Sequence, residues 1–259
     1  MKIWFQLLSA EERMQDFIRA CQAQVNRAAD PGTTVEVHGT KKGALGDNYR
    51  FFEHLDTREV VENIVRLRQG GYDALVIGNS MDIALVEARE MLDIPVLALT
   101  ETTIAFAEMM GERYGIIVPN AKFIPRYREV VVKYRQEQRL AALVPLEFAH
   151  IPDMNRLFRE SEVQDRAIEQ FRTVARQAIA QGAEVLIPAG PPTTLLTMRD
   201  VHEVDGVPIL DGYTLLVKFA ETAVKLRILG HPVVSRYRLY ASPPAALLAQ
   251  ARAEYQRDL

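Results

Sequence analysis

Two turns along the chain place polar or small residues directly after apolar runs. The first, Gly78-Asn79-Ser80, follows Leu75-Val76-Ile77, and the second, Ala189-Gly190-Pro191-Pro192, follows a similar run. The amide of Asn79 donates and accepts hydrogen bonds but does not titrate in the useful range, and Ser80 is a nucleophile only with a base beside it. If the two turns face each other across a cleft, they would bind a small carboxylate or a cyclic amide between them. The free backbone N–H groups at the N-termini of the following helices would donate hydrogen bonds to it.

Other candidate groups lie near the ends of apolar runs. Glu101 follows a run ending at Leu99 and is either a general base, an anchor for a substrate N–H, or a charge that complements a helix dipole. Asp82 and Asp211 are most simply helix caps, and Asp211 could instead touch a ligand. Lys41 could reach an anionic substrate, although a solvated loop charge is the simpler interpretation. The remaining candidates for substrate contact are Gln6, Ser9, Ala189, Gly190, Thr193 and Thr194.

Metal and nucleotide sites leave recognisable spacings, and none occurs in this chain. The five histidines are scattered, without a His-x-x-x-His, Cys-x-x-Cys or acidic ligand pattern. There is no Gly-x-Gly-x-x-Gly and no phosphate-binding loop. The sequence therefore predicts neither a metal site nor a cofactor.

The elements that position these groups alternate between short strands and amphipathic helices, which is typical of βαβ units and a parallel sheet. Expected strands are 3–8, 34–38, 74–77 and 94–99. Asp56-Thr57-Arg58-Glu59 resembles a capping box at the start of a helix that Gly70-Gly71 ends, and Ser161 with Gln164 resembles a second one. A further helix is expected in the C-terminal segment 242–259.

The same order of elements occurs twice. "QGGYDALVIGNS" (69–80) is echoed by "QGAEVLIPAGPP" (181–192), and "IPVLALTETTIAFAEMM" (94–110) by "VPILDGYTLLVKFAETA" (207–223). We interpret this as a duplicated unit of about 110 residues. It predicts an α/β fold of two similar lobes related by a pseudo-two-fold axis, each with a mostly parallel central sheet flanked by helices.

Three segments carry a family resemblance. "YDALVIGNSMDIALVEARE", "IPVLALTETTIAFA" and "GVPILDGYTLLVKFAETAVKL" resemble the aspartate/glutamate/hydantoin racemase superfamily, and the hydantoin racemase branch most of all. The resemblance implies an active site between two lobes. The first lobe would comprise residues 1–104 plus 212–230, and the second lobe residues 105–211. Residues 231–259 would form a C-terminal extension. It also implies roles near the cleft for Tyr49, Asp82 and Glu101, because the hydantoin racemase pattern has these residue types there; Tyr49 could hold a substrate carbonyl or act as an acid.

The racemases of this superfamily are expected to use two cysteines, one per lobe, to remove and return a proton. In this chain the first cysteine position falls on Asn79, and the second on Gly190, or on Ala189 if the alignment shifts by one. The single cysteine, Cys21, lies in an amphipathic helical pattern and is expected to be buried and inert. Two-thiol racemisation is therefore not expected.

Composition bounds the remaining possibilities. The 259 residues are 48% hydrophobic and 25% charged with a net charge of −3, which does not favour nucleic-acid binding. One cysteine excludes an internal disulfide and favours the cytoplasm, and no run is long enough for a signal-peptide core or a membrane span.

The leading hypothesis is a racemase-superfamily enzyme with non-cysteine chemistry, acting on a small carboxylate or amide as a hydrolase or a lyase (decarboxylase) through an oxyanion or enolate. Asn79 and Ser80 would donate hydrogen bonds, and Glu101, Tyr49 or Asp211 would handle protons. The alternatives are a racemase or isomerase with altered acid–base residues and a binding protein without catalysis. A homo-oligomer is expected, with no membrane partner.

Overall fold

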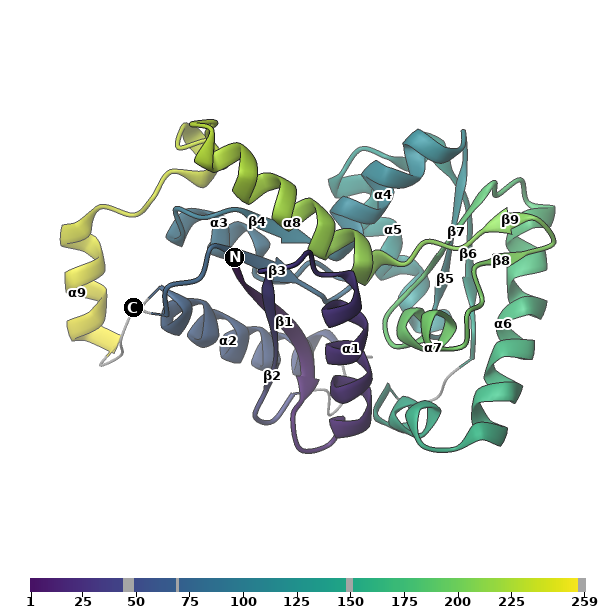
Figure 1. The fold of residues 1–259 in the computed structure, drawn as a ribbon. Helices are drawn as coiled ribbons and strands as arrows, with labels where there is room; N and C mark the ends of the chain where they lie inside the picture. Colours follow the sequence, from purple (N-terminus) through teal and green to yellow (C-terminus); the bar gives the residue numbers. More distant parts are fainter. Residues whose placement is uncertain (44–48, 69, 148–150, 256–259) are drawn as a thin grey trace.

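The structure is a computed structural model that describes residues 1–43, 49–68, 70–147 and 151–255 (Figure 1). It confirms the α/β class: two lobes lie side by side, each built on a parallel sheet with helices around it. The strand order is β2-β1-β3-β4 in the first lobe and β6-β5-β7 in the second. Every neighbouring pair within these two sheets is parallel, so the carboxyl ends of the strands in each sheet share one edge.

The first lobe contains four strands and the helices that cover them. Its strands are β1 (Lys2–Ala10), β2 (Thr34–Thr40), β3 (Ala74–Ile77) and β4 (Val96–Ala98). Its helices are α1 (Gln15–Ala28), α2 (Arg50–Leu67), α3 (Leu85–Met91) and α8 (Gly212–Ile228).

Side-chain alternation in β1 divides the core of this lobe into two layers. Phe5 and Leu7 point into the cluster formed with α1 and α8, while Trp4 and Leu8 point into the cluster formed with α2 and α3. Because successive side chains of a strand face opposite sides, both faces of the sheet are apolar and both are covered. Buried strands of this kind are held in register by packing on both sides.

The second lobe repeats this plan with one continuous core. Its strands are β5 (Tyr114–Val118), β6 (Leu140–Pro145) and β7 (Val185–Pro188), with a hairpin of β8 (Glu203–Val204) and β9 (Val207–Pro208). Its helices are α5 (Ile124–Lys133), α6 (Ser161–Ala180) and α7 (Pro192–Met198). Short 3-10 turns cover Ala121–Phe123, Glu137–Arg139 and Ile151–Phe158.

Two helices connect the lobes. α4 (Leu99–Met110) begins in the first lobe and leads to β5, and its Ile104 and Ala107 pack in the core of the second lobe. From the second lobe the chain then returns through α8, whose Tyr213 and Leu216 pack with Phe5 of β1 (Figure 1). The first lobe is therefore built from both ends of the chain.

One helix start and one helix cap differ from the sequence-based predictions. α2 begins at Arg50, six residues before the expected capping box, so Asp56 lies inside the helix and is buried. α6 begins at Ser161 as expected, but no side chain caps its first turn. Neither helix therefore has a side-chain cap at its start.

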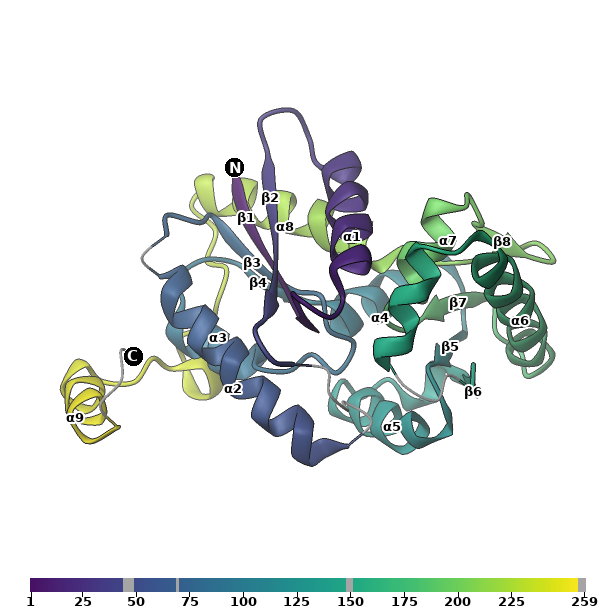
Figure 2. The ribbon, with the colours of Figure 1, turned by 90° about the horizontal axis from the view of Figure 1, so that it is seen from below.

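The C-terminal segment runs along the first lobe and then leaves it. Arg236 donates hydrogen bonds to the backbone carbonyls of Arg89, Glu90 and Leu92, which fixes the segment beside α3. α9 (Ala245–Tyr255) follows, has no buried residue, and stands apart from both lobes in two views (Figures 1 and 2). Across the described ranges, no helix is long and apolar enough to cross a bilayer.

Candidate active site

The two turns singled out in the sequence occupy corresponding places in the two lobes. The last ladder hydrogen bond of β3 runs from Gly78 N to Gln6 O (2.8 Å), and that of β7 from Ala189 N to Ile117 O (2.9 Å). Asn79 and Gly190 are therefore each the first residue beyond the ladder, at the carboxyl end of a parallel strand. Ligands bind at this edge in open α/β sheets.

The turns meet in a pocket between the lobes, which we call the inter-lobe pocket. It has a volume of about 50 Å³. Its polar or glycine residues are Ser9, Glu53, Gly78, Asn79, Ser80 and Gly190, and its other walls include Phe17, Pro119, Phe123, Tyr127, Pro191 and Tyr213. Organic ligands usually occupy pockets of roughly 300–1,000 Å³, so this pocket is smaller than a typical ligand site.

Asn79 presents a hydrogen-bond donor to this pocket. Its Oδ1 accepts a hydrogen bond from Met81 N at 2.8 Å, which closes an Asx turn and orients the amide. Nδ2 has no acceptor among the described residues, so its two hydrogens remain for a ligand. Ser80 contributes its backbone carbonyl to Thr100 Oγ1 (2.6 Å), which ties the turn to the first residues of α4.

The two glycines of the pocket differ in what they allow. A Cβ at Gly78 would lie 2.3 Å from the Phe5 ring, so only glycine fits before Asn79. Gly190 has φ of +73° and open space where a Cβ would point. The left-handed backbone favours glycine there, and the space beside it belongs to the pocket rather than to the core.

Glu53 is the carboxylate of this pocket that the sequence did not reveal. It lies in the first turn of α2 and forms an ion pair with Arg126 of α5, with side-chain exposures of 17% and 6%. A second ion pair between the same helices, Arg50 to Glu129, has an N–O distance of 2.6 Å. Glu53 was not among the residues predicted from the sequence, because the helix was expected to begin later. The only sequence feature that points to Glu53 is its place in the first turn of the helix that follows β2.

Asp82 joins the two lobes just beyond the turn. Its Oδ1 accepts from Thr100 N (2.9 Å), and its Oδ2 accepts from Glu101 N (2.9 Å) and from the Tyr134 hydroxyl of the second lobe (2.6 Å). Asp82 thus caps α4 rather than the helix that follows it in sequence. Burial raises the pKa of its carboxyl to about 6, against the lowering effect of these three donors.

The predicted proton carriers Glu101 and Tyr49 lie outside the inter-lobe pocket. Both carboxylate oxygens of Glu101 accept hydrogen bonds from Arg89, whose Nη1 also contacts the hydroxyl of Tyr240 in the C-terminal segment (3.2 Å). Tyr49 is 54% exposed at the start of α2, and the Lys122 ammonium lies 4.2 Å from its ring centroid.

Several predicted binding residues belong to hydrogen-bond networks elsewhere. Gln6 is buried and bonded to Trp4, Asn63 and the carbonyl of Gly39. In a network between the lobes, Gln24 of α1 donates to Asp211 (2.6 Å) and accepts from Thr194 (2.7 Å). Asp211 also caps α8 by accepting a hydrogen bond from Thr214 N, and the Thr193 hydroxyl donates to the carbonyl of Pro188. Ala189 lines a void of about 10 Å³ together with Ser80. Lys41 lines a different cavity.

The chain matches a known protein family. The family model described as Asp/Glu/Hydantoin racemase matches residues 14–220 of the chain. The chain belongs to this family.

Relatives within the family lie on its hydantoin side. A hydantoin racemase of Pseudomonas sp. (strain NS671) is 26% identical over 204 residues, which cover 77% of each chain. An allantoin racemase structure from Pseudomonas fluorescens has a TM-score of 0.78 with 23% identity, covering 94% of this chain and 97% of that one. An unliganded arylmalonate decarboxylase has a TM-score of 0.54 with 13% identity, covering 86% and 92%. At these identities the two structures establish the shared two-lobe fold.

The one cysteine of this racemase-family chain lies away from the pocket. Cys21 is fully buried on α1, where burial raises the pKa of its thiol far above the ordinary value. It packs in the core of the first lobe with Phe5 and Val25. A thiol in this environment stays protonated at neutral pH.

Proposed function

We propose that this chain is an enzyme of the racemase family that acts on a cyclic amide or a small carboxylate by one-carboxylate chemistry rather than with a pair of thiols. The reaction that we favour is hydrolytic ring opening, with decarboxylation as the variant that uses the same donors. The proposal rests chiefly on the composition of the inter-lobe pocket: its described lining contains one carboxylate, Glu53, and the oriented amide of Asn79, but no thiol.

In this mechanism the first-lobe turn stabilises negative charge. The Asn79 amide, and the Ser80 hydroxyl beside it, would hold a substrate carbonyl oxygen where charge develops in the transition state. Oriented donors of this kind contribute roughly 2.7–4 kcal/mol in other enzymes. The Asx turn supports this role because the amide is already oriented before the substrate arrives.

Glu53 would handle the proton. As a base it would take a proton from water as the water oxygen bonds to the carbonyl carbon; the C–N bond then breaks and the proton passes to the leaving nitrogen. In the decarboxylation variant a C–C bond breaks, carbon dioxide leaves, and the enolate formed is protonated at carbon. The ion pair with Arg126 would hold the Glu53 carboxylate in place at the wall of the pocket.

Racemisation is the second candidate, because the curated relatives are named hydantoin racemases. It needs an acid and a base on opposite faces of the substrate. The second-lobe wall contains Gly190, Pro191, Phe123, Pro119 and Tyr127. Of these only Tyr127 has an ionisable side chain, so Tyr127 would have to supply the second proton carrier. A binding protein without catalysis is the third candidate and predicts protection by a ligand without turnover.

One experiment separates these candidates. The protein is incubated in D₂O with a 5-substituted hydantoin, with allantoin and with an arylmalonate. Proton NMR measures exchange at the α-carbon, and chromatography measures ring-opened acid or decarboxylated product. Ring opening or decarboxylation that Glu53→Gln abolishes and Glu129→Gln leaves intact is the expected result. Deuterium incorporation with loss of optical activity and no other product would establish racemisation instead.

A further inference from the structure

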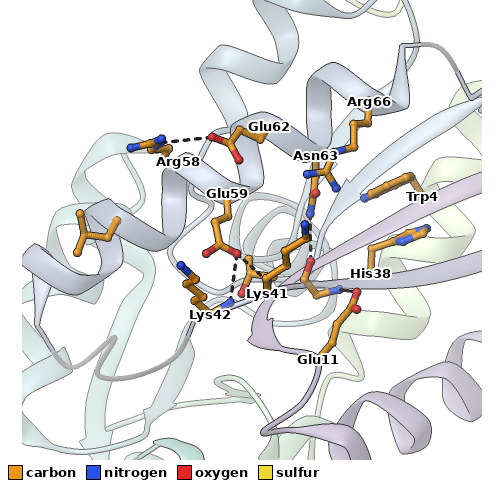
Figure 3. A pocket seen from close by; sticks show the side chains of 13 residues that line it. Trp4, Glu11, His38, Lys41, Lys42, Arg58, Glu59, Glu62, Asn63 and Arg66 are labelled. Atoms are coloured by element: carbon orange, nitrogen blue, oxygen red, sulfur yellow. Dashed lines mark hydrogen bonds and ion pairs between the residues drawn. The ribbon is translucent and has the colours of Figure 1, made fainter. Parts of the chain in front are cut away.

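A second cavity lies away from the inter-lobe pocket. It is a groove of about 420 Å³ on the first lobe, between α2 and the carboxyl end of β2 (Figure 3). It shares no lining residue with the inter-lobe pocket. Its volume lies within the range of roughly 300–1,000 Å³ that small organic ligands occupy. We call it the α2–β2 groove.

The acidic side chains of this groove are already engaged by the protein. Glu59 Oε2 accepts hydrogen bonds from the backbone N–H groups of Lys41 (2.6 Å) and Lys42 (3.2 Å), which fixes the turn after β2. Glu11 Oε1 accepts from Gly39 N at 3.1 Å, and Glu62 pairs with Arg58 at 3.3 Å (Figure 3). Each acid therefore holds part of the wall in place.

Three basic side chains of the groove, in contrast, have no acidic partner in the part of the chain that the structure describes, whereas Arg58 pairs with Glu62. Within the described ranges no carboxylate forms an ion pair with Lys41, Lys42 or Arg66. Figure 3 shows the Lys41 side chain extending from the turn toward the side of the groove where Arg66 of α2 lies. Like charges brought to one side of a groove repel each other and are neutralised by a bound anion.

One wall of the groove contains two stacked aromatic rings. The rings of Trp4 and His38 stack with centroids 3.5 Å apart and an angle of 13° between their planes. Trp4 Nε1 donates to Gln6 Oε1 (2.9 Å), and Asn63 joins the same oxygen to the end of β2. A preformed wall loses little conformational freedom when it binds a ligand, and the rings offer apolar contact for a carbon skeleton.

We propose that the α2–β2 groove binds a small organic dicarboxylate. One carboxylate would lie between Lys41 and Arg66, on the side of the groove where Trp4 and His38 lie, and the carbon chain would run from there to the second carboxylate at Lys42. The volume favours an organic dianion over inorganic phosphate, which would fill only part of the groove. Lys41, a sequence candidate for substrate contact, thereby belongs to a second site.

Trp4 provides a local reporter, because it is the only tryptophan of the chain. Succinate is titrated into the full-length protein at constant ionic strength, and binding is followed by Trp4 fluorescence and by calorimetry. Both should give the same saturable affinity. Lys41→Gln and Arg66→Gln should each weaken it by about tenfold, as expected for loss of a charge-assisted contact. Both residues are exposed, so the variants should fold normally, which circular dichroism checks.

Arg27→Gln is the matched control, since Arg27 is exposed on α1 outside the groove; its affinity for succinate should equal that of the wild type. A second titration uses inorganic phosphate. Phosphate binding with equal affinity and the same variant dependence would overturn the dicarboxylate assignment. Succinate binding without a fluorescence change, binding unaffected by Lys41→Gln and Arg66→Gln, or no binding at all would overturn the site itself.

Discussion

Replacing Tyr134 by phenylalanine tests the contact that joins the two lobes beside the candidate active site. The Tyr134 hydroxyl donates to Asp82 Oδ2 at 2.6 Å, and that oxygen belongs to a carboxylate that is 2% exposed. When Asp82 is ionised this is a hydrogen bond to a charged group, worth about 1.5–3 kcal/mol. When Asp82 is protonated it is an ordinary hydrogen bond, worth about 0.5–1.5 kcal/mol.

The sign of the pH dependence follows from the pKa of Asp82. Burial raises this pKa from 3.8 to about 6. The protonated form of Asp82 is therefore favoured by folding, and its contribution to the free energy of unfolding is fully present below pH 3.8 and is lost as the pH rises through 6. The Tyr134 hydroxyl lowers this pKa, and its removal raises the pKa further. Tyr134→Phe should therefore cost about 1 kcal/mol more at pH 8 than at pH 5, which corresponds to a pKa rise of about 0.7.

The measurement is urea unfolding of the wild type and the variant at both pH values. Tyr114→Phe is the matched control, because the buried Tyr114 hydroxyl donates to a neutral carbonyl, that of Gln136, at 3.1 Å. Its cost should be about 0.5–1.5 kcal/mol at both pH values. An equal cost for Tyr134→Phe at pH 5 and pH 8 would refute the assignment of Asp82 as an ionised group held by Tyr134.

Three other predictions concern Asn79, Cys21 and the C-terminal helix. Asn79→Ala should lower the turnover rate of an identified substrate about 10²–10³-fold, and Asn79→Cys should be equally slow; proton exchange gained by the cysteine variant would mean that Asn79 only replaces a lost base. Because burial raises the pKa of the Cys21 thiol, iodoacetamide should not modify the native protein and Cys21→Ala should remain active; loss of activity in a folded variant would contradict the non-cysteine mechanism. Deletion of residues 245–259 should leave the melting temperature unchanged, since α9 buries no residue, and a lower sedimentation coefficient after deletion would assign α9 to the predicted homo-oligomer.

The sequence by itself was enough to predict the α/β class, the presence of the four strands of the first lobe, and the two turns. Strand Ala74–Ile77 was predicted with its observed bounds, because a short apolar run followed by Gly-Asn-Ser is a local pattern. The repeated order of elements placed Asn79 and Gly190 at matching strand ends. Parallel strands then bring both turns to the same kind of edge, and both line one pocket.

Only the tertiary structure decided which side chains share that pocket. Glu53 enters it from a helix whose start the cap pattern misplaced. Glu101 follows a strand end, yet its carboxylate pairs with Arg89 of α3. Gln6, on the strand itself, faces Asn63 and not the second lobe. Local patterns determine backbone position, but the direction of a long polar side chain depends on which partner the packed lobes bring within hydrogen-bond distance, and those partners are distant in sequence.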